Sequence, residues 1–308
     1  MSKKIVKIAK GYYPTVSYNH SPSELVRILS SKPEENWLTA ISETTRPDLS
    51  ERGMAAIGLI LCGIHTCTDF RDQRPDLFMD YMQWAHNIAQ TVRGGGYDHN
   101  TLDLSEINKT LPFLDKLAGV NLDGTTCEGI LNNRPHKTAS LIEREIASDG
   151  RLMIALGNGG ITSGVDNFAA MRKADDVIHS VWYSHRKADH KEPILGDAEK
   201  EWLIAAAKDR AVIINEDDIY NGTTIYKAAK YFKKLLGCKA IYGVATNTEA
   251  VKSKGGFGPE IVKLGGNNVV YYSRFSLMQY DDNLWRTSAG KIVCGSDYIF
   301  AEHKRNNS

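Results

Sequence analysis

The amino-acid sequence predicts an α/β fold, with a mostly parallel sheet of about five strands flanked by helices and preceded by a largely helical region. Two observations support this prediction. From about residue 149 onward, short apolar runs alternate with stretches of helical periodicity, which is typical of parallel strands joined by crossover helices. Residues 34–92 show helical patterns only, interrupted near Pro47 and Pro75. We therefore expect a mainly helical region of unknown role over residues 1–145 and an α/β domain over residues 146–308.

The first region contains a segment that is apolar on all sides. Residues 54–64 read MAAIGLILCGI, and a helix without a polar face belongs in a protein core. The segment is shorter than the roughly eighteen apolar residues that a membrane-spanning helix needs. In the helical stretch that follows, the side chains of Tyr81, Trp84 and His86 are expected to pack rather than to bind a ligand.

The α/β domain is divided by its apolar runs and its chain breakers. Strands are expected where short runs rich in Val, Ile, Leu and aromatic residues end at polar residues or glycine, and helices where apolar residues recur every three or four positions. The expected strands are residues 152–156, 176–183, 211–215, 240–245 and 268–272. The expected helices are residues 165–173, 197–208 and 223–236.

The composition argues against several classes of protein. The chain has 308 residues, of which 42% are hydrophobic and 24% charged, and its formal net charge is +1. A near-neutral chain is not one whose main task is to coat nucleic acid, and no apolar run is long enough to predict a membrane span. The five cysteines are scattered without metal-ligand spacing, which favours reduced thiols and a cytoplasmic location.

One strand end combines acidic residues with a glycine and two threonines. The apolar run 212–214 leads through Asn215 into Glu216 and Asp217, and Gly222, Thr223 and Thr224 then open a helix. Glycine, successive backbone amides and a helix N-terminus together suit a phosphate group. Carboxylates beside a phosphate must face something else, such as ribose hydroxyls or a hydrated magnesium ion. The alternative is an acidic strand end followed by an ordinary helix cap.

Residues 212–224 (VIINEDDIYNGTT) resemble the phosphoribosyl pyrophosphate (PRPP) loop of the type I phosphoribosyltransferases. The resemblance implies that Glu216 and Asp217 face the ribose hydroxyls and contact Mg²⁺ through them or through water. It also implies that backbone amides hold the 5′-phosphate, those of Tyr220, Asn221, Gly222, Thr223 and Thr224. The sequence departs from the family pattern at Asn221, where threonine is usual, and at Tyr220, where purine-salvage members carry a carboxylate.

Two further segments agree with this resemblance. Asn158, Gly159 and Gly160 follow the strand at 152–156, where the family has a short glycine-containing loop whose amides contact pyrophosphate. Residues 184–191 are polar and cationic, where the family has a mobile lid, so Arg186, Lys187 and Lys191 become candidates for neutralising the leaving pyrophosphate. The alternative for this segment is a solvated charged loop.

The resemblance implies an enzyme that binds PRPP or a ribose 5-phosphate nucleotide with Mg²⁺ and transfers or releases the ribosyl group at C1. Glu216, Asp217, Arg186 and Lys187 are its expected catalytic residues, and the acceptor is unidentified. The alternative is a non-catalytic or conditionally active nucleotide-binding module, for example the effector or toxin of a bacterial defence or toxin–antitoxin system controlled by a partner. Residues 1–145 are expected to mediate homo-oligomerisation or binding of a partner protein. Nucleic acid would be bound only through such a partner, and no membrane association is expected.

Overall fold

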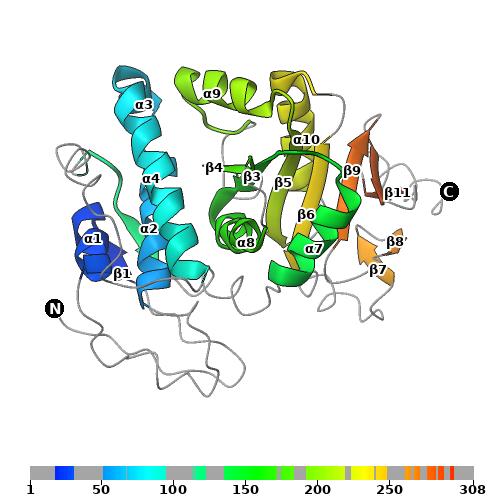
Figure 1. The fold of residues 1–308 in the computed structure, drawn as a ribbon, viewed down its shortest axis with the longest axis horizontal. Coiled ribbons are helices and arrows are strands. Elements are labelled where there is room, and N and C mark those ends of the chain that lie inside the picture. Colours follow the sequence, from blue (N-terminus) through cyan, green and yellow to red (C-terminus); the bar gives the residue numbers. More distant parts are fainter. Residues whose placement is uncertain are drawn as a thin grey trace, which may run out of the picture. The chain divides into compact units, whose positions relative to one another are not determined.

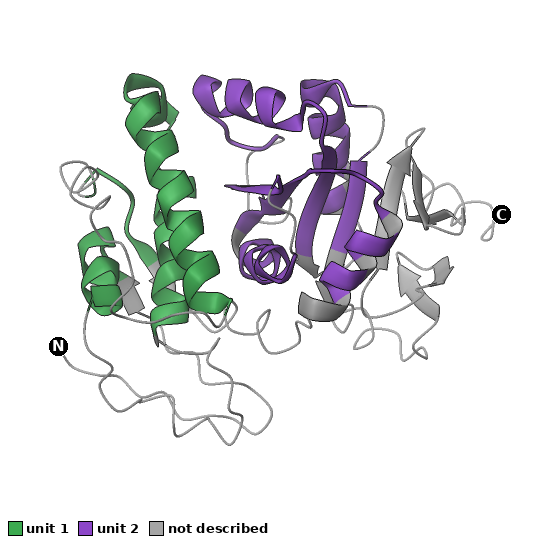
Figure 2. Ribbon diagram, viewed as in Figure 1, with its two compact units in different colours: residues 1–131 green, residues 132–308 purple. Residues whose placement is uncertain are grey.

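The computed structural model of the protein describes residues 18–30, 51–66, 68–94, 114, 116–122, 135–171, 175–183, 192–218, 223–238, 241–247, 261–264, 267–270, 276–281, 284–287 and 292–294. The chain forms two compact units, residues 1–131 and residues 132–308 (Figure 2). Within the described ranges, no helix is both long and apolar enough to cross a membrane.

The first unit is mainly helical. It contains α1 (Pro22–Ser30), α2 (Glu51–Ile64), α3 (Thr68–Gln73) and α4 (Pro75–Arg93), with a short antiparallel pair formed by β1 (Tyr18–His20) and β2 (Val120–Leu122). Every residue of α2 from Ala55 to Ile64 is buried, which confirms the core helix predicted from residues 54–64. The helix is buried on all sides because it has no polar face to present to water.

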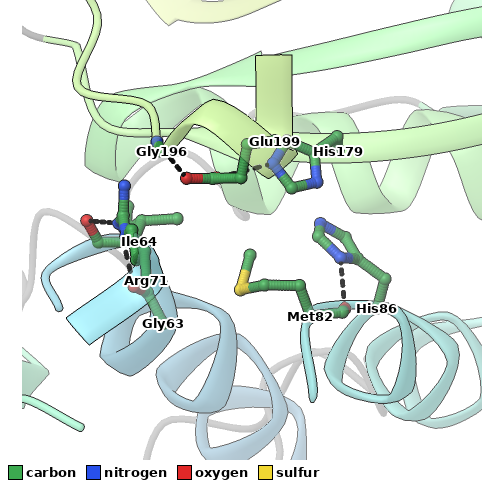
Figure 3. Close-up of polar contacts among 8 residues, drawn as sticks. All are labelled: Gly63, Ile64, Arg71, Met82, His86, His179, Gly196 and Glu199. Atoms are coloured by element: carbon green, nitrogen blue, oxygen red, sulfur yellow. Dashed lines mark hydrogen bonds and ion pairs between the residues drawn. The ribbon is translucent and has the colours of Figure 1, made fainter. Parts of the chain in front are cut away.

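Two buried polar side chains of this unit contact carbonyl oxygens of its helices. The guanidinium of Arg71 donates hydrogen bonds to the carbonyl oxygens of Gly63 (2.9 Å) and Ile64, at the end of α2, where a cation also complements the helix dipole (Figure 3). The ring of His86 contacts the carbonyl oxygen of Met82 through Nδ1 at 2.6 Å. Tyr81, Trp84 and His86 are all buried, as their helical pattern predicted.

The second unit is built around one sheet. Its described strands have the order β11-β10-β9-β6-β5-β3-β4 (Figure 1). The elements are α7 (Pro135–Glu145), β3 (Arg151–Leu156), α8 (Gly157–Ala170), β4 (Val177–Val181), α9 (Asp197–Ala207), β5 (Ala211–Asp218), α10 (Thr223–Leu236), β6 (Ile241–Asn247), β9 (Ser276–Asp281), β10 (Leu284–Thr287) and β11 (Ile292–Cys294). Strands β6, β5, β3 and β4 run parallel, and β9, β10 and β11 extend the sheet antiparallel.

Helices cover both faces of the parallel part. Leu152 and Ile154 of β3 pack in one cluster with Ile214 of β5, Leu203 of α9 and Phe232 of α10. Helix α8 packs on the opposite face, with α7 beside it. Because both faces are covered, every residue of β3 is buried, which explains why this strand reads as a continuous apolar run after Arg151.

The α/β prediction is confirmed for four parallel strands flanked by helices. The predicted sheet size of about five strands is not confirmed, because the described sheet has seven strands, of which β9, β10 and β11 are antiparallel. The predicted strand at 268–272 is wrong as a member of this sheet. A strand is present there as β8 (Asn267–Val270), but it pairs with β7 (Ile261–Leu264) in a separate two-stranded sheet. The next neighbour of β6 is instead the antiparallel strand β9. Helix α7, which the predicted domains placed in the first region, belongs to the second unit.

Candidate functional site at the carboxyl edge of the parallel strands

The strand order creates a topological switch point between β3 and β5. From β3 the chain passes through α8 to β4 on one side of β3, and then through α9 to β5 on its other side. Helix α8, which follows β3, packs on one face of the sheet, and α10, which follows β5, packs on the other, so the chain leaves the carboxyl ends of these two neighbouring strands in opposite directions. In open α/β sheets, ligands bind in the crevice outside the carboxyl ends of the strands at such a point.

The glycine segment predicted as a loop is the first turn of α8. The helix begins at Gly157, directly after β3, and therefore includes Asn158, Gly159 and Gly160. Gly157 has φ of +35°, and a side chain there would overlap the carbonyl oxygen of Tyr183 beyond the end of β4. The abrupt turn from strand to helix therefore depends on glycine. The predicted helix start at residue 165 is wrong because the glycines did not mark an irregular loop.

The same turn lies against β5 on its other side. A Cβ atom on Gly160 would come within 2.7 Å of the Asn215 carbonyl oxygen and 3.1 Å of the Glu216 Cα. Both are backbone atoms of a paired strand and have little freedom to move. The structure thus brings two of the predicted segments together, the glycine turn after β3 and the acidic end of β5.

Hydrogen bonds of the Asn215 side chain stabilise this contact between α8 and β5. The residue is fully buried, and its Nδ2 donates hydrogen bonds to the Gly160 carbonyl oxygen (2.9 Å) and to Ser163 Oγ (2.7 Å). Its Oδ1 accepts a hydrogen bond from Asn167 Nδ2 at 2.9 Å. The first three turns of α8 are therefore tied to the residue that precedes Glu216. The sequence offered one indication of this role, a polar residue at the end of an apolar run.

Two ionisable side chains lie at the described part of this edge. Glu216 is half-buried, and Tyr183 is buried with 3% of its surface exposed. Burial, then the nearby carboxylates of Glu216 and Glu192, raise the pKa of Tyr183 to about 12. The phenol is therefore neutral and a hydrogen-bond donor at physiological pH. Sequence reasoning did not single out Tyr183.

The residues on either side of the predicted cationic segment are paired with each other just after β4. Trp182 and Ile194, which flank it, form an antiparallel bridge in which the Ile194 N–H donates to the Trp182 carbonyl oxygen at 3.2 Å. Next along the chain, Glu199 of α9 accepts a hydrogen bond from the Gly196 N–H (2.8 Å) and contacts His179 Nε2 (3.0 Å) (Figure 3). Both contacts are buried. Arg186, Lys187 and Lys191 lie between these anchors and outside the described residues.

The remaining predicted site residues are described in part. Helix α10 begins at Thr223, as predicted, and Thr224 is half-buried in its first turn. Asp217 and Thr223 are described only as members of β5 and α10. Tyr220, Asn221 and Gly222 lie outside the described residues.

The predicted magnesium ligands are few in number. Among the described residues there is no group of three or more His, Cys, Asp or Glu side chains that could hold a metal ion. Magnesium is commonly bound through one or two carboxylates together with phosphate oxygens of a ligand. Glu216, a half-buried carboxylate at the strand end, fits that kind of donor set.

Comparison with protein-family models, with curated proteins and with solved structures found no match for this chain.

Proposed function

We propose that the protein is a phosphoribosyltransferase-like enzyme that binds PRPP or a ribose 5-phosphate nucleotide with Mg²⁺ and transfers or releases the ribosyl group at C1. The observation that carries the proposal is the contact of the α8 first turn with the end of β5 at the topological switch point. This contact puts Gly160 beside Glu216, two residues that the family resemblance assigns to one ligand.

Each part of the edge suits a different part of such a ligand. The first-turn amides of a helix have no acceptor within the helix, so those of α8 and α10 suit phosphate oxygens. Glu216 suits the ribose hydroxyls, which donate to a carboxylate. A bound magnesium ion would be held by Glu216 and Asp217 and would offset the negative charge of the phosphates.

The transition state of such a transfer resembles an oxocarbenium ion, so positioning and charge neutralisation do most of the catalytic work. The chain's contribution is to fix the ribose at Glu216 and to supply cations to the departing pyrophosphate. Arg186 and Lys187 suit this second task, because the bridge between Trp182 and Ile194 keeps both ends of their segment at the end of β4.

The test is calorimetry with magnesium and PRPP, comparing the wild type with Glu216→Gln plus Asp217→Asn. We expect a loss of roughly 10- to 100-fold in affinity, the range for hydrogen bonds to charged groups. Glu201→Gln, a carboxylate removed from an exposed position on α9, is the control and should bind as the wild type. Absence of binding by the wild type at millimolar PRPP would contradict the proposal.

Substitutions in the cationic segment distinguish an enzyme from the non-catalytic alternative. Arg186→Ala with Lys187→Ala should leave PRPP affinity intact and abolish pyrophosphate release, measured with a panel of bases and with water as acceptors. Lys208→Ala, an exposed lysine after α9, is the control. A wild type that binds PRPP and releases no pyrophosphate with any acceptor would favour a nucleotide-binding module controlled by a partner.

A further inference from the structure

Tyr183 carries a buried hydroxyl for which the described residues provide no hydrogen-bond partner. The side chain is 3% exposed. Burying a hydroxyl without a partner is unfavourable, and native proteins pair the great majority of such groups. Its ring packs in the apolar cluster between the sheet and helices α9 and α10, so the ring is accounted for and the hydroxyl is not.

The register of the sheet brings the end of β4 to the level of Glu216. Val181 pairs with Leu156, and Asn215 pairs with Ala155, so Val181, Leu156 and Glu216 lie at one level of the sheet. Two strand spacings, about 10 Å, separate the backbones of β4 and β5 at that level. Tyr183 follows two residues after Val181 and projects to the same face. The phenol, two residues beyond the end of β4, and the side chain of Glu216, two residues after Ile214, therefore face the same side of the sheet, with β3 between their strands.

The electrostatic coupling between the two side chains agrees with this placement. The carboxylate of Glu216 is one of the groups that raise the pKa of Tyr183, after burial itself. The pair therefore consists of a neutral phenol, which can donate a hydrogen bond, and a carboxyl group, which can accept one. Because no hydrogen bond to the phenol is present among the described residues, the donor is not satisfied by the carboxylate.

We infer that the Tyr183 hydroxyl donates a hydrogen bond to a sugar hydroxyl of the ligand, and that the sugar hydroxyl in turn donates a hydrogen bond to the carboxylate of Glu216. A sugar hydroxyl is both donor and acceptor, so it can accept a hydrogen bond from the phenol and donate one to the carboxylate at the same time. A phosphate oxygen would instead be repelled by the carboxylate. This inference rests on the proposed function and adds a ligand-binding residue to it. Together with the phosphate site of the proposed function, it selects a phosphorylated sugar with a free hydroxyl at this position.

The test is a double-mutant cycle with Tyr183→Phe and Glu216→Gln, titrating ribose 5-phosphate in the presence of magnesium. We expect Tyr183→Phe to weaken binding about 10-fold or more. The double variant should bind no more weakly than the weaker single variant, because both side chains act on one hydroxyl. Tyr242→Phe on β6 is the control and should leave binding unchanged, since Tyr242 is outside the Tyr183 cluster.

A second measurement separates ligand binding from a structural role. Without ligand, Tyr183→Phe should unfold at the same temperature as the wild type or higher, because it removes a buried hydroxyl that makes no bond. A lower unfolding temperature, or unchanged affinity for ribose 5-phosphate, would overturn the inference. If the losses of binding free energy were additive in the double variant, the two side chains would not act on the same ligand hydroxyl, and that part of the inference would be wrong.

The outcomes also distinguish this inference from the proposed function. If the wild type binds and Glu216→Gln does not, while Tyr183→Phe binds normally, only the role of Tyr183 is wrong. If the wild type binds neither ribose 5-phosphate nor PRPP, the proposed function fails and the inference fails with it.

Discussion

Removing the side chain of Asn215 should loosen the contact between α8 and β5 and thereby test how the candidate site is held. The change is Asn215→Ala. It deletes two donated hydrogen bonds, to the Gly160 carbonyl oxygen and Ser163 Oγ, and one accepted from Asn167. All of these groups are buried, so the partners lose a bond that water does not readily replace.

The expected cost follows from these three bonds. Each contributes about 1 kcal/mol, and leaving the buried amide of Asn167 without an acceptor adds about 1–3 kcal/mol. Ser163 Oγ also donates to the Gly160 carbonyl oxygen at 3.3 Å, so that carbonyl keeps one partner. We expect a loss of about 4–6 kcal/mol, against about 1–2 kcal/mol for Ser163→Ala, which removes one of the three bonds.

Hydrogen exchange followed by peptide mass spectrometry suits this prediction because the chain has two compact units. Protection of the β3, β5 and α8 amides should fall in Asn215→Ala, and that of α2 and α4 in the first unit should not change. Equal losses of protection in Asn215→Ala and Ser163→Ala would refute the reasoning, since Asn215 would then not be the centre of the network.

Two further substitutions test the surroundings of the site. Gly160→Ala should destabilise the protein by about 1–3 kcal/mol, although alanine favours a helix by up to about 1 kcal/mol, because its Cβ would meet the β5 backbone at 2.7 Å; an increased unfolding midpoint would contradict that contact. Glu199→Ala should cost about 3–5 kcal/mol in urea unfolding, because it removes the buried acceptor of His179 and of the Gly196 N–H. Glu199→Gln, which keeps one acceptor oxygen, should cost less, and an equal cost would contradict the role of these bonds.

The sequence predicted the parallel strands well because each is a short apolar run with a sharp polar end. Helix α10 was predicted with its observed limits, Thr223 and Leu236, from its amphipathic pattern. The start of α8 was missed because glycine is read as a chain breaker, whereas Gly157 lets the chain turn directly from strand into helix. Strands β9 to β11 were missed because short antiparallel strands at a sheet edge lack a continuous apolar run.

The candidate site was predicted from sequence only in part. The acidic end of β5 and the glycine turn were identified from local patterns. Asn215 and Tyr183 were not, because their roles depend on partners distant in the sequence. Asn215 of β5 bonds Gly160 and Ser163 of α8, and the carboxylate of Glu216 helps to raise the pKa of Tyr183 although the two residues are far apart in the sequence. A local pattern carries no information on such pairings.

The location of the site and the identity of its ligand rest on different observations. The location follows from strand order: β3 and β5 are neighbours, the helices that follow them pack on opposite faces, and open α/β sheets bind ligands outside the carboxyl ends of the strands at such a point. The proposed ligand rests on side chains, an acid and a neutral phenol that suit a hydroxyl, and on helix N-termini that suit phosphate. A failure to bind PRPP would therefore remove the ligand assignment and leave the edge between β3 and β5 as the place to look for another.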